Sequence, residues 1–355
     1  MVLGGRSGFA ASKLGREKDV NETVEFSIIM PVCHGGVFLR DALVSLRALA
    51  FQPERFEVLV AGSADDTESH ETVTAESLTV KYSLSYVPSS NSNRSALLNT
   101  ACASAKGRYL AFADDDCIFL PDWLQKLSVV LHSNPGVGII GGLDEIGSGR
   151  SSFDNALDCV FRSFIGTGGL RKGSGMRVGK YYPKLWNMTI PRETALCVAA
   201  NNREGVPQIF NESLLVHEDV DLAHRIGNTG KKVLFSPEVR IRHSRDTTFR
   251  SFVRRNFTMA RTCRRLGIHR FPHTALTIFA LGALFLPIAS FFYRPLWLMV
   301  LSYMGIYIIT LLLVPIGALK RTRNWKTLAI IPPLLMSLHF ARGMGYLLPL
   351  RKGGI

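Results

Sequence analysis

The sequence predicts an α/β domain, followed by an amphipathic helix and an all-α membrane segment. Short apolar runs alternate with stretches of helical periodicity over the first two thirds of the 355 residues. This alternation is typical of a sheet whose strands are connected by helices. A basic, aromatic stretch follows, and then two uncharged apolar runs that are each long enough to cross a membrane as a helix.

Four short apolar runs predict the first strands. They are Val24–Val32, Phe56–Gly62, Leu84–Pro88 and Arg108–Asp116. Four segments of helical spacing follow them in turn, at Gly35–Gln52, Glu68–Leu78, Arg94–Gly107 and Asp122–Ser133. Strands that alternate with helices of this length favour a parallel, doubly wound sheet. The glycine- and serine-rich stretch Gly147–Gly179 has weak periodicity, and we expect loops and short elements on the acceptor side there.

Three polar turns follow predicted strands: VCHGG, GSADDTE and DDDC. Ligands of such sheets bind at the carboxyl ends of the strands, so these turns should line one crevice. The last turn holds three adjacent carboxylates, Asp114, Asp115 and Asp116. Carboxylates suit a hard cation that also binds substrate phosphates. A solvated, helix-capping turn is the alternative that the triplet alone leaves open.

Three motifs together resemble family 2 glycosyltransferases, the inverting enzymes of the GT-A fold. NSNRSALLNTACASAKGRYLAFADDD is similar to their N-x-G-K-x-x-A-L-N … D-x-D run, and IIMPVCHGG is similar to their first-strand signature. Val216–His243 resembles their E-D-x-[DE]-L-x-x-R motif. The resemblance implies a mixed sheet flanked by helices in a domain of residues 24–246, after a disordered tail of residues 1–23. The membrane segment resembles that of bacterial exopolysaccharide-type members.

The resemblance implies a donor site for a UDP- or GDP-sugar with Mg2+ or Mn2+. Asp116 would ligate the cation and Asp114 would hold the ribose and the metal through water, while Asp115 would orient the donor sugar. His243 would add a metal or diphosphate contact, or it is a surface histidine. The turn that grips the nucleobase comprises Pro31, Val32, Cys33 and His34.

Several positions depart from the family pattern. The second strand lacks its usual terminal acid, which leaves Asp65 or Asp66 to meet the base or ribose. Arg94 replaces the usual lysine and can still meet a diphosphate bidentately. Cys33 and His34 replace the usual aromatic and asparagine, and no base and orienting group accompany Cys33 as a catalytic cysteine would require.

The general base that inversion needs is implied at Asp219, preceded by Glu218. We expect the like charges of Glu218 and Asp221 to raise its proton affinity. Acidic residues also favour a helix start, and the two roles are compatible. Arg225 is expected to form an internal ion pair.

The net charge of +14 is concentrated in the C-terminal third. No acidic residue follows Asp246, whereas 15 basic residues do, and the first 246 residues hold 27 basic and 28 acidic residues. The accompanying apolar runs favour a membrane surface over nucleic acid as partner. We expect residues 247–272 to form a basic interfacial helix. Arg254 and Arg255 would close over the donor diphosphate, or they face lipid.

Residues 273–355 are the predicted membrane segment. Thr274–Tyr293 and Pro295–Ala318 contain no charged residue and predict two spans. In Thr327–Leu348, Pro332 and Pro333 should break the helix, and His339 and Arg342 are costly at mid-membrane. This third run spans, re-enters or lies in the interface. Basic loops predict a multi-pass plasma-membrane protein whose catalytic domain is cytosolic, and no signal peptide is recognisable at the N-terminus.

The predicted function is metal-assisted, inverting transfer of a sugar to a hydroxyl of a lipid-linked or glycan acceptor. Transfer to a polyprenyl phosphate is the nearest alternative, because an ionised phosphate needs no base. A non-catalytic membrane scaffold is a third possibility. The Q-x-x-R-W motif of processive synthases is absent from the sequence, which favours addition of a single sugar.

Overall fold

We describe the protein from a computed structural model. The structure describes residues 24–33, 35–146, 151–168, 181–201, 206–214, 216–243, 247–268, 270–319 and 322–348. The predicted tail of residues 1–23 and the predicted nucleobase contact of His34 lie outside these residues.

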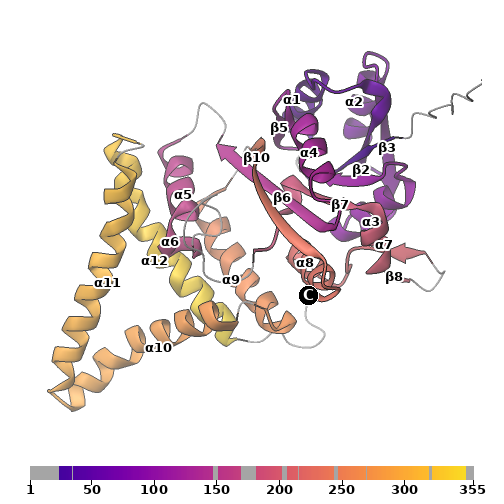
Figure 1. The fold of residues 1–355 in the computed structure, drawn as a ribbon. Helices are drawn as coiled ribbons and strands as arrows, with labels where there is room; N and C mark the ends of the chain where they lie inside the picture. Colours follow the sequence, from indigo (N-terminus) through magenta and orange to yellow (C-terminus); the bar gives the residue numbers. More distant parts are fainter. Residues whose placement is uncertain are drawn as a thin grey trace, which may run out of the picture.

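An eight-stranded mixed sheet forms the centre of the part of the chain that precedes α9 (Phe249–Leu266) (Figure 1). Its order is β3-β2-β1-β4-β7-β6-β10-β5, and a separate ribbon pairs β8 with β9. The strands are β1 (Phe26–Pro31), β2 (Phe56–Ser63), β3 (Ser83–Ser89), β4 (Tyr109–Phe112), β5 (Cys117–Phe119), β6 (Val137–Ile146), β7 (Met188–Pro191), β8 (Ala200–Asn201), β9 (Pro207–Gln208) and β10 (Lys232–His243).

The four predicted strands are confirmed as β1 to β4, and they run parallel to one another. A parallel sheet throughout is wrong, because β7 is antiparallel to both β4 and β6, and β5 is antiparallel to β10. The mixed sheet that the family resemblance implied is therefore confirmed. The alternation of strands and helices in the first half of the sequence could not reveal that β7 runs in the opposite direction.

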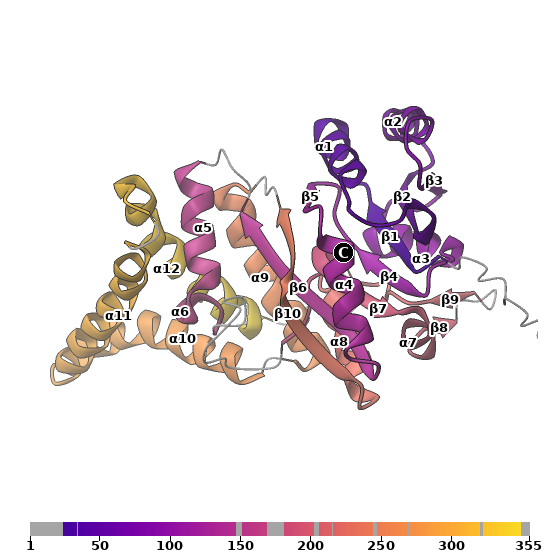
Figure 2. The same cartoon turned by 45° about the horizontal axis from the view of Figure 1, so that its top comes forward.

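Helices cover both faces of this sheet (Figure 2). One face packs against α1 (Gly36–Arg47), α2 (Thr67–Ser77) and α4 (Trp123–His132). The other face packs against α3 (Arg94–Ser104), α7 (Arg192–Cys197) and α8 (Glu218–Asn228). Alternate residues of β1 point to opposite faces, so Ile28 and Met30 join the first core and Ile29 joins the second. Both faces are apolar because both are covered.

The stretch expected to hold loops and short elements contains two helices, α5 (Ser152–Arg162) and α6 (Phe164–Thr167). A capping box between Ser151 and Asp154 begins α5. Its buried residues Ala156, Leu157 and Val160 pack against the C-terminal helices. These two helices are the short elements that were expected together with loops. Their partners lie about 170 residues away in the sequence, so the sequence did not show what they pack against.

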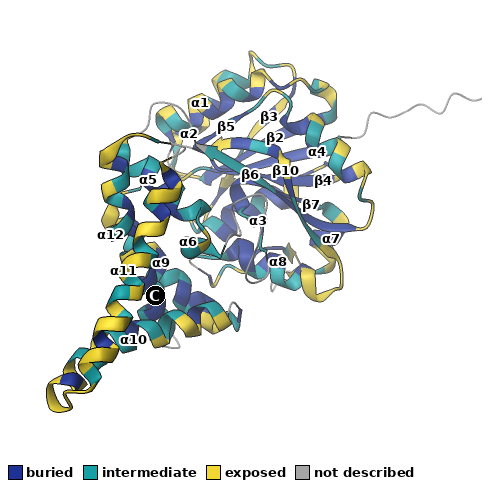
Figure 3. Ribbon diagram, turned by 60° about the vertical axis from the view of Figure 1, so that its left-hand side comes forward, coloured by how far each residue is buried: buried dark blue, intermediate teal, exposed yellow. Residues whose placement is uncertain are grey.

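Four long helices end the chain: α9 (Phe249–Leu266), α10 (Arg270–Phe292), α11 (Leu296–Ala318) and α12 (Trp325–Leu347). Three segments are long and apolar enough to cross a membrane, namely Phe271–Phe292, Leu296–Ala318 and Trp325–Leu347. Figure 3 shows α10 and α11 with largely exposed surfaces. By contrast, α12 lies against α9 and α5, and its buried residues Ile331, Leu334, Leu335 and Leu338 share an apolar core with them.

The predicted break of the third run at Pro332 and Pro333 is wrong, because α12 is one continuous helix. Its polar residues have protein partners that the sequence could not reveal. His339 Nε2 lies 3.0 Å from the carbonyl oxygen of Ile165, and Arg342 donates to Asn256 Oδ1 at 3.1 Å. Neighbouring helices can support a proline-containing helix when they satisfy its polar groups.

Candidate active site

The pairing of β5 with β10 brings the acidic triplet against His243. The register places His243 opposite Cys117, the residue after Asp116. His243 Nε2 lies 2.9 Å from Asp116 Oδ1 and 3.9 Å from Asp114 Oδ2. All of these side chains are buried. The sequence places these groups about 130 residues apart, and the antiparallel pairing joins them at one edge of the sheet.

The side chains at this edge of the sheet offer ligand atoms that fit a divalent cation. Ligand atoms of Asp116, Cys117 and His243 all lie within 4.8 Å of one another. Asp116 Oδ1 is buried, and beside His243 Nε2 it has no hydrogen-bond partner within the described residues, as expected for an oxygen that a metal could bind. Burial raises the pKa of the Cys117 thiol well above its ordinary value, so the carboxylates and the imidazole are the better ligands.

Trp186, which the sequence analysis missed, orients His243. The two rings stack with centroids 4.8 Å apart and planes at 24°. Trp186 belongs to the 3-10 helix η2 (Leu185–Asn187), directly before β7. Because β7 runs antiparallel to β4, residues that precede β7 lie beside the turn that follows β4. No sequence pattern around Trp186 predicts that it lies beside His243.

Asp115 holds the first turn of the domain in place. It has no exposed surface, and its Oδ2 accepts hydrogen bonds from the backbone amides of Cys33 and Gly35, each at 2.9 Å. Gly35 has a φ of 60°, a conformation that glycine adopts without strain. A contact between Asp115 and the donor sugar would require this carboxylate to leave both amides.

Arg94 links the acidic triplet to the acidic pair at the start of α8. It forms an ion pair with Asp114, and its Nε lies 3.3 Å from Glu218 Oε1. Burial lowers the pKa of Arg94, but Asp114 and Glu218 outweigh this effect and raise it above its ordinary value. Two motifs that are separate in the sequence therefore meet at one guanidinium.

Lys184, also missed by the sequence analysis, pairs with Asp219. Its Nζ lies 3.0 Å from Asp219 Oδ2, and His217 Nδ1 lies 3.7 Å from Asp219 Oδ1. Burial raises the pKa of Asp219, but Lys184 and His217 outweigh it and hold that pKa well below its ordinary value. The expectation that neighbouring carboxylates raise the proton affinity of Asp219 is wrong, because these two groups are closer.

His217 and Glu218 complete this side of the site. His217 is the one non-glycine residue with positive φ among the described residues, at 69°. Burial lowers its pKa below the ordinary value, which keeps the imidazole neutral near pH 7. Burial raises the pKa of Glu218 even though Arg94 opposes this change. Backbone strain at His217 marks a position where the fold holds an unfavourable conformation beside Asp219.

The other residues predicted for the nucleotide site belong to the end of β1 and the turn after it, and to the turn before α2. Pro31 ends β1, and Val32 donates its amide to the carbonyl oxygen of Ala61 at 2.7 Å, while Cys33 is exposed. Asp66 caps α2 through the amide of Ser69 at 3.0 Å, whereas Asp65 is exposed. The structure therefore gives Asp66 a role in the fold.

Two arginines of α9 and Arg225 differ in their surroundings. Arg254 and Arg255 are exposed, and Arg255 is near enough to His217 to lower the pKa of that imidazole. No ion pair of Arg254 occurs within the described residues. Arg225 pairs with Asp221 at 2.9 Å and donates to the carbonyl oxygens of Val198 and Ile209, which confirms its predicted internal role.

Residues 27–181 match the family model described as Glycosyl transferase family 2. This part of the chain is similar to family 2 glycosyltransferases. The match supports glycosyltransferase as the enzymatic class.

Solved structures resemble the chain at low sequence identity, and one of them, with a TM-score above 0.5, shares its fold. The mannosyltransferase PcManGT from Pyrobaculum calidifontis, in complex with GDP-Man and Mn2+, is 16% identical with a TM-score of 0.53, over 90% of this chain and 86% of that chain. S. aureus TarS 1-349 in complex with UDP-GlcNAc is 15% identical with a TM-score of 0.46, over 88% of this chain and 91% of that chain. No curated protein sequence matches the chain.

Proposed function

We propose that this glycosyltransferase moves a sugar from a nucleotide diphosphate sugar to an acceptor presented at a membrane, with inversion at the anomeric carbon. The observation that supports this proposal is the meeting of two charged groups at one edge of the sheet. Asp114, Asp116 and His243 form one group, and Lys184 and Asp219 form the other. Arg94 contacts Asp114 of the first group and Glu218, the residue before Asp219.

The first group is the proposed donor side. Asp114, Asp116 and His243 would hold Mg2+ or Mn2+, which supplies Lewis-acid stabilisation of the departing diphosphate when bound. Arg94 is positioned to exchange its contact with Asp114 for a phosphate oxygen, since guanidinium binds phosphate bidentately. The turn that ends with Cys33, fixed by Asp115, borders the site proposed for the nucleobase. A UDP- or GDP-sugar is the donor class, as in the PcManGT and TarS complexes.

The second group is the proposed acceptor side. Asp219 would accept the proton of an acceptor hydroxyl as this oxygen attacks the anomeric carbon and the bond to the diphosphate breaks. An aspartate that pairs with Lys184 is a weak base. Displacement of Lys184 from Asp219 by the bound acceptor would raise the pKa of this carboxylate and strengthen it as a base.

The same ion pair supports a second candidate, transfer to the phosphate of a polyprenyl carrier. A phosphate is already ionised and needs no base. It would instead need a cation in the crevice, and Lys184 lies there 3.0 Å from Asp219. In this case Asp219 would hold Lys184 in position and would not take a proton.

The C-terminal helices would anchor the enzyme to the plasma membrane with the catalytic domain in the cytosol. We propose residues 24–246 as the catalytic domain, 247–272 as an interfacial helix and 273–355 as the membrane segment. The seven arginines between Phe249 and Phe271 suit an anionic lipid surface. Lipid-linked or glycan acceptors would reach the crevice from this surface.

Release of nucleoside diphosphate from a panel of UDP- and GDP-sugars tests the proposal. The full chain in detergent is supplied with Mg2+ or Mn2+ and a membrane lipid extract, and activity should depend on one donor, on the cation and on the extract. Asp219→Asn separates the two acceptors: it should abolish transfer to a hydroxyl and preserve much of the transfer to a phosphate. Activity that is indifferent to chelator would contradict the metal assignment.

A further inference from the structure

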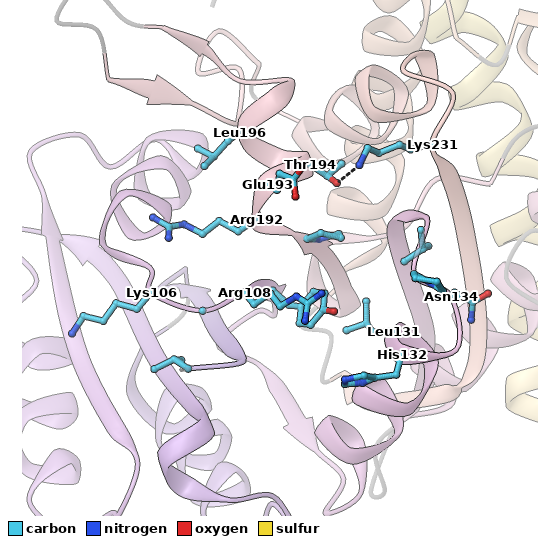
Figure 4. A pocket seen from close by; sticks show the side chains of 16 residues that line it. Lys106, Arg108, Leu131, His132, Asn134, Arg192, Glu193, Thr194, Leu196 and Lys231 are labelled. Carbon is cyan, nitrogen blue, oxygen red and sulfur yellow. Dashed lines mark hydrogen bonds between the residues drawn. The ribbon is translucent and has the colours of Figure 1, made fainter. Parts of the chain in front are cut away.

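A cavity lies at the ends of the central strands that are opposite to the end near Asp116 (Figure 4). Its volume is about 560 Å³, and the lining comes from the segment before β4, the end of α4 and the start of α7. The four residues of β4 separate it from the acidic triplet, a length of about 13 Å. This volume falls in the range of small-molecule sites.

Four cationic side chains line this cavity: Lys106, Arg108, Arg192 and Lys231. Figure 4 shows Lys106, Arg108 and Arg192 around its left and centre, and Lys231 across from them beside Thr194. None of the four forms an ion pair within the part of the chain that the structure describes. Glu193 is the one carboxylate among the described lining residues.

Two of these cations come from opposed backbone positions beside the β4–β7 pair. Arg192 donates its amide to the carbonyl oxygen of Arg108 at 2.9 Å, where antiparallel β4 and β7 pair Tyr109 with Pro191. Like charges at opposed positions of an antiparallel pair destabilise it unless an anion lies between them. The first 246 residues are nearly neutral, with 27 basic and 28 acidic residues, so general basicity does not explain this concentration.

The backbone that carries Lys106 and Arg108 is held by buried groups. Lys106 donates its amide to Glu57 Oε1 at 2.6 Å, and Gly107 donates its amide to Ser27 Oγ at 2.8 Å. A Cβ at Gly107 would lie 2.4 Å from the amide nitrogen of Ser27, so this segment packs directly on β1. The cations therefore extend from a pre-organised backbone, which lowers the entropic cost of binding.

We propose that this cavity binds a phosphate-bearing anion at a site separate from the donor crevice. Arg108 and Arg192 offer planar guanidinium groups that bind phosphate oxygens in pairs, and Lys231 adds a point charge from the facing side. A soluble phosphate ester or diphosphate and a phosphorylated lipid headgroup share this chemistry. The proposal does not depend on the donor, the acceptor or the base assigned above.

Calorimetric titration of the full chain in detergent with inorganic pyrophosphate tests the soluble source. EDTA is present so that no metal can support binding at the donor side. Arg108→Ala and Arg192→Ala should each weaken the affinity about tenfold, the change expected for loss of one charge-assisted hydrogen bond. Glu193→Gln should strengthen it, because the variant removes the one carboxylate of the lining. Lys126→Ala, on the outer face of α4, is the matched control and should bind like the wild type.

Flotation with vesicles of phosphatidylcholine, with and without phosphatidic acid, tests the lipid source. All variants retain the arginines of α9, so only the cavity differs between them. Weaker binding of Arg108→Ala and Arg192→Ala to either probe supports the proposal and identifies the source. Unchanged binding of both variants to both probes overturns it, as does pyrophosphate binding that only Arg94→Ala abolishes. Melting temperatures of all variants verify that each is folded.

Discussion

The proposed donor side and the proposed acceptor side of the site both centre on a buried aspartate, but their surroundings are opposite. Asp116 faces the imidazole of His243 at 2.9 Å, and beside that imidazole its Oδ1 has no hydrogen-bond partner within the described residues. Asp219 pairs with the ammonium of Lys184 at 3.0 Å. The first carboxylate keeps an oxygen for a cation from outside, whereas the second already has a cation from the chain itself.

This difference teaches that an acidic motif alone does not specify its chemistry. The two aspartates lie in acidic clusters that look equivalent in the sequence. Their neighbours come from β10 and from the segment before β7, both distant along the chain. A buried charge persists only when something compensates it, so the compensating group determines what each aspartate can do.

The largest expected effect comes from the donor side. Asp116→Asn should lower kcat/KM at least about 10³-fold, because loss of the cation removes several kcal/mol of stabilisation from the departing diphosphate. Added Mg2+ or Mn2+ should not restore the rate. Initial rates of nucleoside diphosphate release measure it, with Asp122→Asn in the following loop as control. A variant that keeps its metal dependence would place the cation elsewhere.

On the acceptor side, Lys184→Met should move the acid limb of the pH profile of kcat/KM to higher pH. Lys184 holds the pKa of Asp219 below its ordinary value. Removal of the lysine raises this pKa, so Asp219 becomes protonated, and inactive as a base, at a higher pH than in the wild type. For each unit by which the pKa of Asp219 rises, kcat/KM should fall about tenfold at pH values below that pKa.

Lys184→Arg should restore the wild-type limb, because it restores the charge. An identical limb in Lys184→Met and the wild type would show that Asp219 is not the titrating base, and would favour the phosphate acceptor. The ion pair should also stabilise the fold above about pH 4, the ordinary pKa of an aspartate. That contribution is lost as the pH falls through the lowered pKa of Asp219.

The smallest effect is expected at Asp115, whose carboxylate holds a turn of the backbone in place. Asp115→Asn should raise the KM for the donor about tenfold with little change in kcat, because the turn at Cys33 and Gly35 loses two charge-assisted hydrogen bonds. Thermal unfolding should begin at a lower temperature. Asp41→Asn on the exposed face of α1 is the control. A large loss of kcat with unchanged KM would instead place Asp115 among the groups that act in the reaction.

The sequence by itself determined the order of the first strands and helices, the acidic triplet at a strand end and the segregation of charge. These features follow from local periodicity and from turn chemistry, which depend on residues within a few positions of one another. The family resemblance added the mixed sheet and the role proposed for Asp219. Arg225 was also placed correctly, since its partner Asp221 lies one helical turn away.

Only the tertiary structure decided which groups meet. Trp186 and Lys184 enter the site because β7 runs antiparallel to β4, and no pattern near either residue indicates this. Pro332 and Pro333 lie within a continuous helix that α9 and α5 support, against the local rule for proline. The physical reason is common to these cases: the pKa of a buried group and the persistence of a strained helix depend on neighbours that are remote in sequence and close in space.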